Sequence, residues 1–310
     1  MNEGGPDAMP EPAHSSHLVL PDGTPVTTHG GITARQNERT AEDQQTIPVI
    51  IKRNDEAVRH PDDTLARAID EGLEQLIRPL LSLFLSSIAA GLLVGFSAMA
   101  VAVVTSLTVN SEPLVIRLLQ AAVYPLGFVV CVTSGAQLFT EHTATAVFPV
   151  LDRRASKRQL LRLWAVVVAG NILGAFVIAS MLTMAEPVIL AHDGYVEIGH
   201  HLLSPDSSAL LMSAILAGWL MAIGAWLVLS TPPDISQIAV IYIATFLIGL
   251  GGLHHSIAGS AEVFLAAYAD PSVEPLEVIR FISLALFGNL IGGSFFVGIL
   301  NYGHIRKTQS

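Results

Sequence analysis

Two adjacent histidines, His254 and His255, lie within a long apolar and glycine-rich segment, GLGGLHHSIAGSAE at residues 249–262. An imidazole changes its charge near neutral pH, so His255 could give a proton to a small anion. The anion would then cross an apolar barrier as a neutral acid and avoid most of the cost of desolvating a charge. The alternative is a structural role, in which the His255 ring bonds to interrupted backbone.

A second polar segment, TSGAQLFTEHTAT at residues 133–145, interrupts another apolar stretch. Thr140 is a candidate cap for a helix that restarts there, since threonine is favoured at helix N-caps. Glu141 and Glu262 are the acidic residues of the two polar segments. Either carboxylate could pair with a histidine, with Arg117 or with Arg280.

The histidines do not predict a metal site. His254 and His255 could be grouped with His142 or His201, but adjacent helical residues point in different directions and no cysteine or carboxylate cluster accompanies them. We therefore expect no metal and no cofactor, with His254 facing the interior or an interface. The sequence has no nucleotide-binding loop and no nucleophile–base set, so no enzymatic activity is expected. It is also too weakly basic for nucleic-acid binding.

The composition places these segments in a membrane protein. Of the 310 residues, 51% are hydrophobic and 14% are charged, whereas a soluble domain carries about 25% charged residues. Runs of 18 or more apolar residues are typical of membrane-spanning helices. Six such spans are predicted, near residues 80–107, 114–151, 159–185, 208–230, 235–268 and 276–300. The second and fifth are too long for one ordinary crossing of about 20 residues, and they contain the two polar segments.

The remaining segments flank this channel-like domain, which we place at residues 79–302. Residues 1–54 are rich in Gly, Pro, His, Thr and Asp, a composition typical of a disordered tail. In residues 55–78, apolar side chains recur at helical spacing on a charged background, which predicts an amphipathic helix along the membrane surface. An extension of the first span is the alternative for this helix. Residues 303–310 form a short C-terminal tail.

The distribution of Lys and Arg predicts the orientation of the chain in the membrane. Residues 152–162 contain five basic residues, and the tail after the sixth span contains Arg306 and Lys307. The 187–206 and 269–277 loops contain no Lys or Arg. Both termini are therefore expected on the cytoplasmic side of a bacterial inner membrane. Arg117 and Arg280 are the basic residues of the opposite side, where they could form a positive vestibule or extend to the lipid headgroups.

The two halves of the chain repeat each other. Residues 86–91 of the first span resemble residues 213–218 of the fourth, and the sequence Gly-Asn-x-x-Gly occurs at 170–174 and at 288–292. Three spans per repeat is an odd number, so the second copy must be inverted. Inverted repeats with broken helices are typical of transport pathways, because interrupted backbone survives in a membrane only inside protein or beside water. We expect Asn171 and Asn289 to form structural hydrogen bonds between helices.

These motifs resemble the formate/nitrite transporter family. Gly135-Ala136 followed by Leu138-Phe139-Thr140 is similar to its G-A-x-L-F-T motif, and His254-His255-Ser256-Ile257-Ala258 is similar to its E-H-S-I-A motif. The resemblance covers about residues 75–305 and includes the two G-N-x-x-G motifs. The long polar N-terminal segment and the LFTE and GSAE variants are most similar to the YfdC-like branch.

The resemblance implies an all-α, aquaporin-like protomer with six transmembrane helices, a homopentamer in the lipid bilayer, and a pore through each protomer. The expected substrates are small monovalent weak-acid anions such as formate, nitrite or hydrosulfide. Leu138 and Phe139 would belong to the broken second span, with Phe139 at a constriction and Thr140 hydrogen-bonded to His255. Further predicted pathway residues, each of which could instead be a core residue, are Tyr124, Phe128 and Ile248. His254 is also predicted to lie on the pathway.

Three positions differ from the family pattern. His254 replaces a glutamate, Gly218 replaces an asparagine before Trp219, and His200 and His201 stand where a lysine is usual. Two alternative functions therefore stay open. One is a pore for water or a small neutral solute, although the sequence has no Asn-Pro-Ala repeats. The other is a non-transporting membrane protein that keeps the fold.

Overall fold

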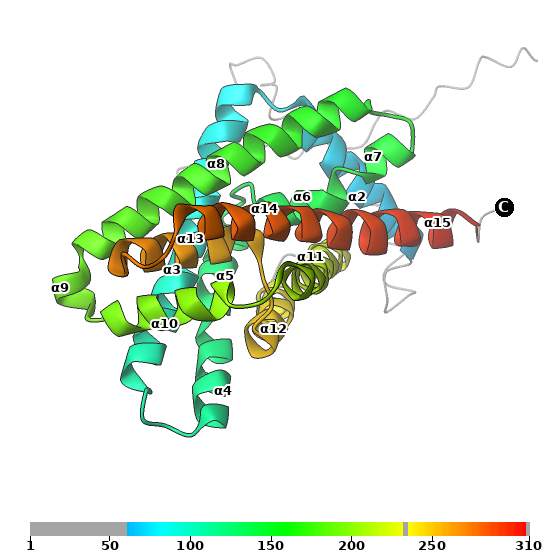
Figure 1. The fold of residues 1–310 in the computed structure, drawn as a ribbon. Coiled ribbons are helices and arrows are strands. Elements are labelled where there is room, and N and C mark those ends of the chain that lie inside the picture. The colour runs from blue at the N-terminus through cyan, green and yellow to red at the C-terminus, as the bar shows by residue number, and fades with distance from the viewer. Residues whose placement is uncertain (1–60, 232–234, 308–310) are drawn as a thin grey trace, which may run out of the picture. The chain divides into compact units, whose positions relative to one another are not determined.

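The computed structural model describes residues 61–231 and 235–307, and all of the regular structure in these two ranges is helical (Figure 1). The predicted N-terminal tail, residues 1–54, lies outside the described residues. The helices are α2 (Pro61–Ile77), α3 (Leu80–Leu107), α4 (Pro113–Val123), α5 (Pro125–Thr133), α6 (Phe139–Thr145), α7 (Phe148–Leu151), α8 (Lys157–Met184), α9 (Glu186–Ile189), α10 (His192–Leu203), α11 (Ser207–Ser230), α12 (Ile235–Gly251), α13 (Ser256–Ala269), α14 (Pro275–Ile291), the π-helical η1 (Gly292–Ile299) and α15 (Leu300–Lys307).

The predicted all-α membrane class is confirmed. Within the described residues, five helical segments are long and apolar enough to cross a membrane, and α12 with α13 makes a sixth if this bent pair counts as one span. In the second predicted span, α4 and α5 already form a 21-residue crossing segment. Two shorter helices, α6 and α7, follow this segment. The outer surfaces of the spans expose many large apolar side chains, including Leu81, Phe96 and Phe287.

Both predicted interruptions are turns that contain a left-handed glycine. Helix α5 ends at Thr133 and α6 begins at Phe139, with Gly135 at φ 71° between them. Helix α12 ends at Gly251 and α13 begins at Ser256, with Gly252 at φ 60° and a bend of 49°. Glycine adopts this conformation at little cost because it has no Cβ.

The two repeats pack in matching ways. Helix α3 packs along α8 in the first repeat, and α11 packs along α14 and η1 in the second. At the closest approach, a Cβ on Gly91 would collide with the backbone of Asn171, and a Cβ on Gly218 would collide with the backbone of Asn289. The half-helices are exchanged: α13 packs on α3 and α8, whereas α6 packs on α11 and η1. The breaks of both repeats therefore meet in the middle of the protein.

Three elements differ from the sequence interpretation in detail. Helix α2 corresponds to the amphipathic helix predicted at residues 55–78, and its apolar side chains Leu65, Ile69 and Leu76 are buried against the other helices. Its position at a membrane surface stays a prediction. The 187–206 segment, expected to be a loop, contains the helix α10. The last span becomes π-helical at Gly292, where Gly293 lies against Thr143.

Candidate functional site

Thr140 and His255 meet where the two breaks face each other. Thr140 is the second residue of α6, and His255 is the residue before α13. The Thr140 hydroxyl lies 2.9 Å from Nε2 of His255. Both side chains are buried, with 0% and 1% of their surface exposed. The polar pair thus joins residues 115 positions apart in the sequence.

The hydrogen bonds of His255 define which ring nitrogen carries the proton. Nδ1 accepts the backbone N–H groups of Ile257 and Ala258, each at 3.2 Å, and so caps α13. A backbone N–H can only donate, so Nδ1 has no proton in this arrangement. The neutral ring therefore carries its proton on Nε2, which points at Thr140.

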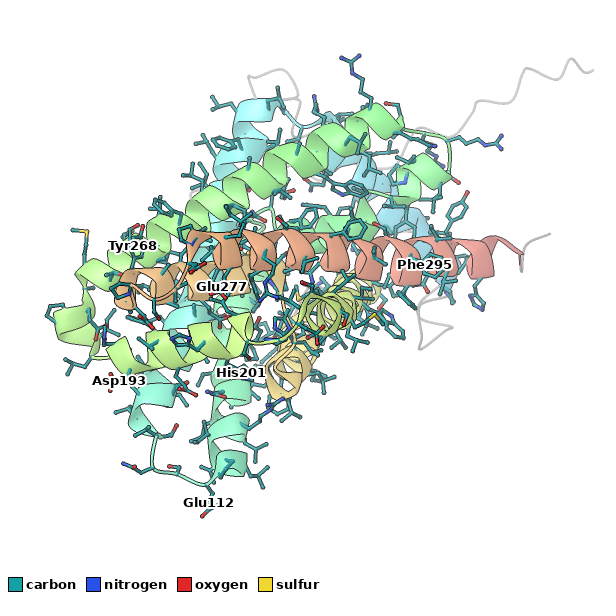
Figure 2. The ribbon with its side chains drawn as sticks, in the orientation of Figure 1. Glu112, Asp193, His201, Tyr268, Glu277 and Phe295 are labelled. Atoms are coloured by element: carbon teal, nitrogen blue, oxygen red, sulfur yellow. The ribbon has the colours of Figure 1, made fainter. Side chains whose placement is uncertain are left out.

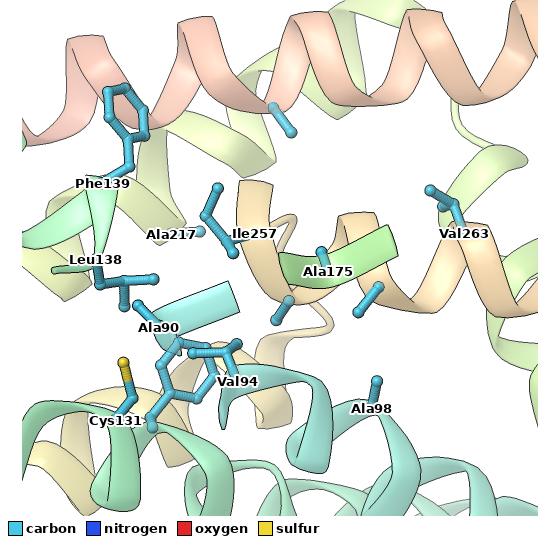
Figure 3. Close-up of a cluster of buried hydrophobic side chains, with 14 of the residues drawn as sticks. Ala90, Val94, Ala98, Cys131, Leu138, Phe139, Ala175, Ala217, Ile257 and Val263 are labelled. Atoms are coloured by element: carbon cyan, nitrogen blue, oxygen red, sulfur yellow. The ribbon is translucent and has the colours of Figure 1, made fainter. Parts of the chain in front are cut away.

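An apolar ring contacts this pair, and the other apolar side chains predicted for the pathway are buried. The Phe128 ring meets the His255 ring edge-on at a centroid distance of 4.9 Å, and the Tyr124 ring lies tilted against Phe128 at a centroid distance of 5.2 Å. Ile248 and Leu138 are fully buried. Figure 3 shows Leu138 and Phe139 at the start of α6, with their side chains pointing in opposite directions. Phe128, Leu138 and Phe139 are all buried, so these three side chains close the space around the pair in this conformation.

Two asparagine side chains, Asn171 and Asn289, bind backbone groups at the two breaks, and we call them the asparagine clamps. The Asn171 side chain accepts from the N–H of Phe139 at 2.8 Å and donates to the carbonyls of Ser87 and Gln137. The Asn289 side chain accepts from the N–H of Ser256 at 2.8 Å and donates to the carbonyls of Ala214 and His254.

Both clamps thus pair backbone groups that the interruptions release from helical bonding, which buried backbone requires. The sequence predicts structural hydrogen bonds between helices for Asn171 and Asn289, and both side chains form such bonds in the structure.

The His254 side chain contacts residues of α11 and α14, apart from the Thr140–His255 pair. Its Nδ1 lies 2.7 Å from the Ser213 hydroxyl, and its ring packs at 5.8 Å from the Phe281 ring. No sequence pattern indicates Ser213 as the partner of His254, because the two residues lie 41 positions apart. Gly218 faces the backbone of Asn289, so the asparagine of the family pattern would not fit there without a shift of the helices.

A cavity of about 610 Å³ is lined by Tyr124 and Ile248, among other residues, and by no residue of the 152–162 segment that is predicted to be cytoplasmic. Arg117 lines it and donates from Nε to the carbonyl of Leu250 at 2.7 Å. Helix α10 contributes a row of charged and titratable side chains, of which Figure 2 shows Asp193 and His201. Sequence analysis missed this row because it treated the segment as a loop.

Two predicted charges lie outside this cavity. Arg280 donates from its guanidinium to the carbonyls of Leu203 and Pro205, at the end of α10. His200 points away from the cavity and bonds Asp270 at 2.7 Å. The pKa of Asp270 is lowered by the backbone N–H of Ser272 and by His200. Of the basic residues expected on this side, Arg117 is the one that lines the cavity.

Glu141 lies beside a much smaller void, of about 10 Å³, between α5, α6, α11 and α12. This volume is near the minimum that holds one water molecule. His142, its neighbour, bonds weakly to Thr145 and accepts the indole N–H of Trp164 at its backbone carbonyl. Among the described residues, no group of three or more His, Cys, Asp and Glu side chains could hold a metal ion.

The sequence profile of the formate/nitrite transporter family matches residues 62–303, which is more than three quarters of the chain. This chain belongs to the formate/nitrite transporter family. The inner membrane protein YfdC of Escherichia coli K12 is 32% identical over 244 residues, or 77% of each chain. The formate channel FocA of Haemophilus influenzae is 23% identical and is covered over 89% of its length.

Solved structures of the same family share the fold. An FNT family ion channel matches with a TM-score of 0.72 at 18% identity, over 79% of this chain and 99% of that one. A pentameric formate channel with formate bound matches with a TM-score of 0.63 at 21% identity, over 74% and 98%. The predicted resemblance to this transporter family is therefore confirmed. So is the expectation that the chain is not an enzyme, because the family is one of transporters.

Proposed function

We propose that this protein is a channel for small monovalent weak-acid anions of the formate, nitrite or hydrosulfide class. The observation that carries the proposal is the buried hydrogen bond between Thr140 and His255, in contact with the Phe128 ring at the meeting point of two broken spans. A broken span in a membrane is tolerated where it lines a pathway or is buried in protein. The likeness to formate channels supports the same reading.

The constriction favours a neutral solute over a charged one. An anion that passes Phe128 and Phe139 loses its water among apolar side chains, and this loss is costly. A neutral acid pays much less, and the Nε2–H of His255 and the hydroxyl of Thr140 replace part of its hydration. The substrate would thus enter as an anion and cross the centre as an acid.

His255 contributes to this step as a hydrogen-bond donor. Transfer of its own proton stays a hypothesis from the sequence, and the cap on α13 argues against it. A second proton on Nδ1 would displace the N–H groups of Ile257 and Ala258. Without that second proton, a ring that gave up Nε2–H would become an imidazolate anion.

The proposal includes a homopentamer in a bacterial inner membrane, with both termini in the cytoplasm. One solved relative is a pentameric channel, and YfdC is an inner membrane protein. Large apolar side chains cover the outside of the spans, where they would contact lipid or neighbouring protomers. The basic residues at 152–162 support the orientation.

Flux into proteoliposomes tests the proposal. The purified full chain should take up formate, nitrite or hydrosulfide faster than protein-free vesicles. His255→Asn and Thr140→Val should lower that flux about tenfold or more, because each removes one partner of a buried bond that the solute must use. The exposed-residue variant His304→Asn, on α15, is the control and should keep the wild-type rate. Equal flux in all four proteins would contradict the assignment of the pathway.

A pore for a small neutral solute is the second candidate, because carboxylates outnumber cations in the large cavity. Asp193, Glu197 and Glu262 line it beside Arg117 and His201, and such a surface does not concentrate anions. Osmotic swelling in glycerol or urea without uptake of any weak acid would favour this candidate. Absence of both activities in an intact oligomer would favour a non-transporting protein.

A further inference from the structure

The Glu262 side chain lies in a position that the proposed pathway does not yet use. It is on α13, seven residues after His255, which is about 10 Å along the helix axis. Only 5% of the residue is exposed, and it lines the 610 Å³ cavity. Among the described residues, no donor bonds its carboxyl group. A buried charged carboxylate without a donor is costly, whereas a protonated carboxyl offers its own O–H to a solute.

We propose that Glu262 is the group that protonates the weak-acid anion in the cavity, before the neutral acid passes Tyr124 and Phe128 toward His255. This inference rests on the proposed function. The proton donor is then Glu262 and not the central histidine, and the cavity is the place where the anion becomes the neutral acid that can cross.

The step requires no reagent besides water and protons. The O–H bond of the Glu262 carboxyl breaks, and a new O–H bond forms on the substrate anion (S–H in the case of hydrosulfide). The products are a Glu262 carboxylate and a neutral acid. A hydronium ion from the aqueous cavity then returns a proton to the carboxylate, so that one proton moves inward with each anion.

The groups around Glu262 suit both halves of this reaction. Asp193, Glu197 and His201 are spaced four residues apart on α10, so they share one face of that helix, and all three line the cavity. The negative potential of the Asp193 and Glu197 carboxylates raises the local proton concentration. Arg117, from α4, reaches the turn at Gly252, and its guanidinium is available to hold an anion in the same cavity. Tyr124 is the remaining titratable neighbour.

The hydrogen bonds of His255 make it a poorer proton donor than Glu262. Its Nδ1 is committed to α13, and its single proton lies on Nε2. Glu262 caps nothing, and its carboxyl faces space that water and a small anion can enter. The two residues therefore have separate tasks: Glu262 supplies the proton, and His255 guides the neutral acid.

The test uses the full chain in proteoliposomes with a pH-sensitive dye inside and a formate gradient directed inward. Glu262→Gln keeps the shape of the side chain but removes the transferable proton. We expect formate-driven acidification to fall about tenfold or more, and its increase toward acidic pH to disappear. Glu262→Asp keeps a carboxyl group and should restore part of the rate together with the pH dependence. Glu277→Gln, an exposed position on α14 outside the cavity (Figure 2), is the matched control.

The outcomes separate the inference from the function on which it rests. Wild-type vesicles that take up neither formate, nitrite nor hydrosulfide would contradict the proposed function and this inference together. Wild-type uptake that Glu262→Gln leaves unchanged in rate and pH profile would overturn this inference alone. Loss of uptake in both Glu262→Gln and Glu262→Asp, with an intact oligomer on size-exclusion chromatography, would identify a packing role and would also overturn it.

Discussion

The turn between α5 and α6 and the turn between α12 and α13 have matching hydrogen bonds but different side chains at the same position. In each, an asparagine from the following long helix accepts the first N–H of the new half-helix and donates to two carbonyls. The residue before that half-helix is Leu138 in one turn and His255 in the other. Leu138 makes no side-chain cap, whereas His255 caps α13.

This difference shows how a duplicated framework acquires an asymmetric site. The clamps are required twice, because each break releases buried backbone groups. The proposed chemistry is required once, because the pathway that we propose passes between the breaks. The histidine comes from the second repeat and its hydroxyl partner, Thr140, from the first. Each repeat thus supplies half of the polar pair, and neither break alone contains the site.

The largest expected effect is the loss of a clamp. Asn171→Ala and Asn289→Ala each leave one buried N–H and the carbonyls at the break without their partner. Each unpaired buried group costs about 1–3 kcal/mol, so both variants should unfold at clearly lower temperature in detergent. Circular dichroism would record the transition, with Asn301→Ala on α15 as the control. A large loss at one asparagine and none at the other would break the equivalence of the two turns.

Loss of the close helix contacts ranks second. Gly91→Ala and Gly218→Ala place a methyl group against the backbones of Asn171 and Asn289, which cannot rotate away. Overpacking of this kind costs about 1–3 kcal/mol, and both variants should lower the unfolding temperature to a similar degree. Gly303→Ala is the matched control, since a Cβ there meets nothing within 4 Å. Tolerance of alanine at Gly218 alone would show that the second repeat packs more loosely.

The third effect isolates the cap that the two turns do not share. His255→Leu gives the second turn the residue type of the first and removes the acceptor for the N–H groups of Ile257 and Ala258. His255→Asn retains a capping side chain. Loss of a cap costs about 1 kcal/mol, so the leucine variant should be less stable than the asparagine variant. Equal stability would mean that the Nδ1 contacts contribute little.

Much of this framework could be predicted from the sequence. The length of the second and fifth spans and the polar or glycine-rich stretches at 133–145 and 249–262 indicated both breaks. The repeated Gly-Asn-x-x-Gly motif predicted structural asparagines. The contact of Thr140 with His255 came from the family resemblance, since nothing local links residues so far apart.

Other features depend on tertiary packing and had no local signal. The row of Asp193, Glu197 and His201 on α10 was not predicted, because a 12-residue helix with acidic residues and no Lys or Arg resembles a loop by composition. The cap at Nδ1 depends on the rotamer of His255, and the cavity beside Glu262 depends on the packing of the five helices that line it, α3, α4, α10, α12 and α13. The displacement of Arg280 from the cavity also could not be predicted, because its acceptors are carbonyls at the end of α10.

The smallest effect concerns the start of the first long helix of each repeat. Asp206 caps α11 by accepting the N–H groups of Ser208 and Ala209, whereas the corresponding residue before α3 is Pro79, which makes no such bond. Hydrogen bonds from the Ser208 side chain, Ala209 and the Ser208 backbone lower the pKa of Asp206 below its ordinary value of 3.8. A carboxyl whose pKa is lowered by folding stabilises the folded state above its ordinary pKa, and this contribution is lost as the pH falls through the lowered value.

Asp206→Ala should therefore lower the unfolding temperature slightly at neutral pH, and the difference from wild type should shrink as the pH falls below 3.8. Asp206→Asn keeps a good cap that does not titrate, so it should resemble wild type at neutral pH and escape the acid-induced loss. Pro79→Ala removes no cap and should show no such pH dependence. A difference between Asp206→Ala and wild type that persists unchanged to about pH 2, below the ordinary pKa range of aspartate, would show that the cap acts through shape and not through the ionised carboxylate.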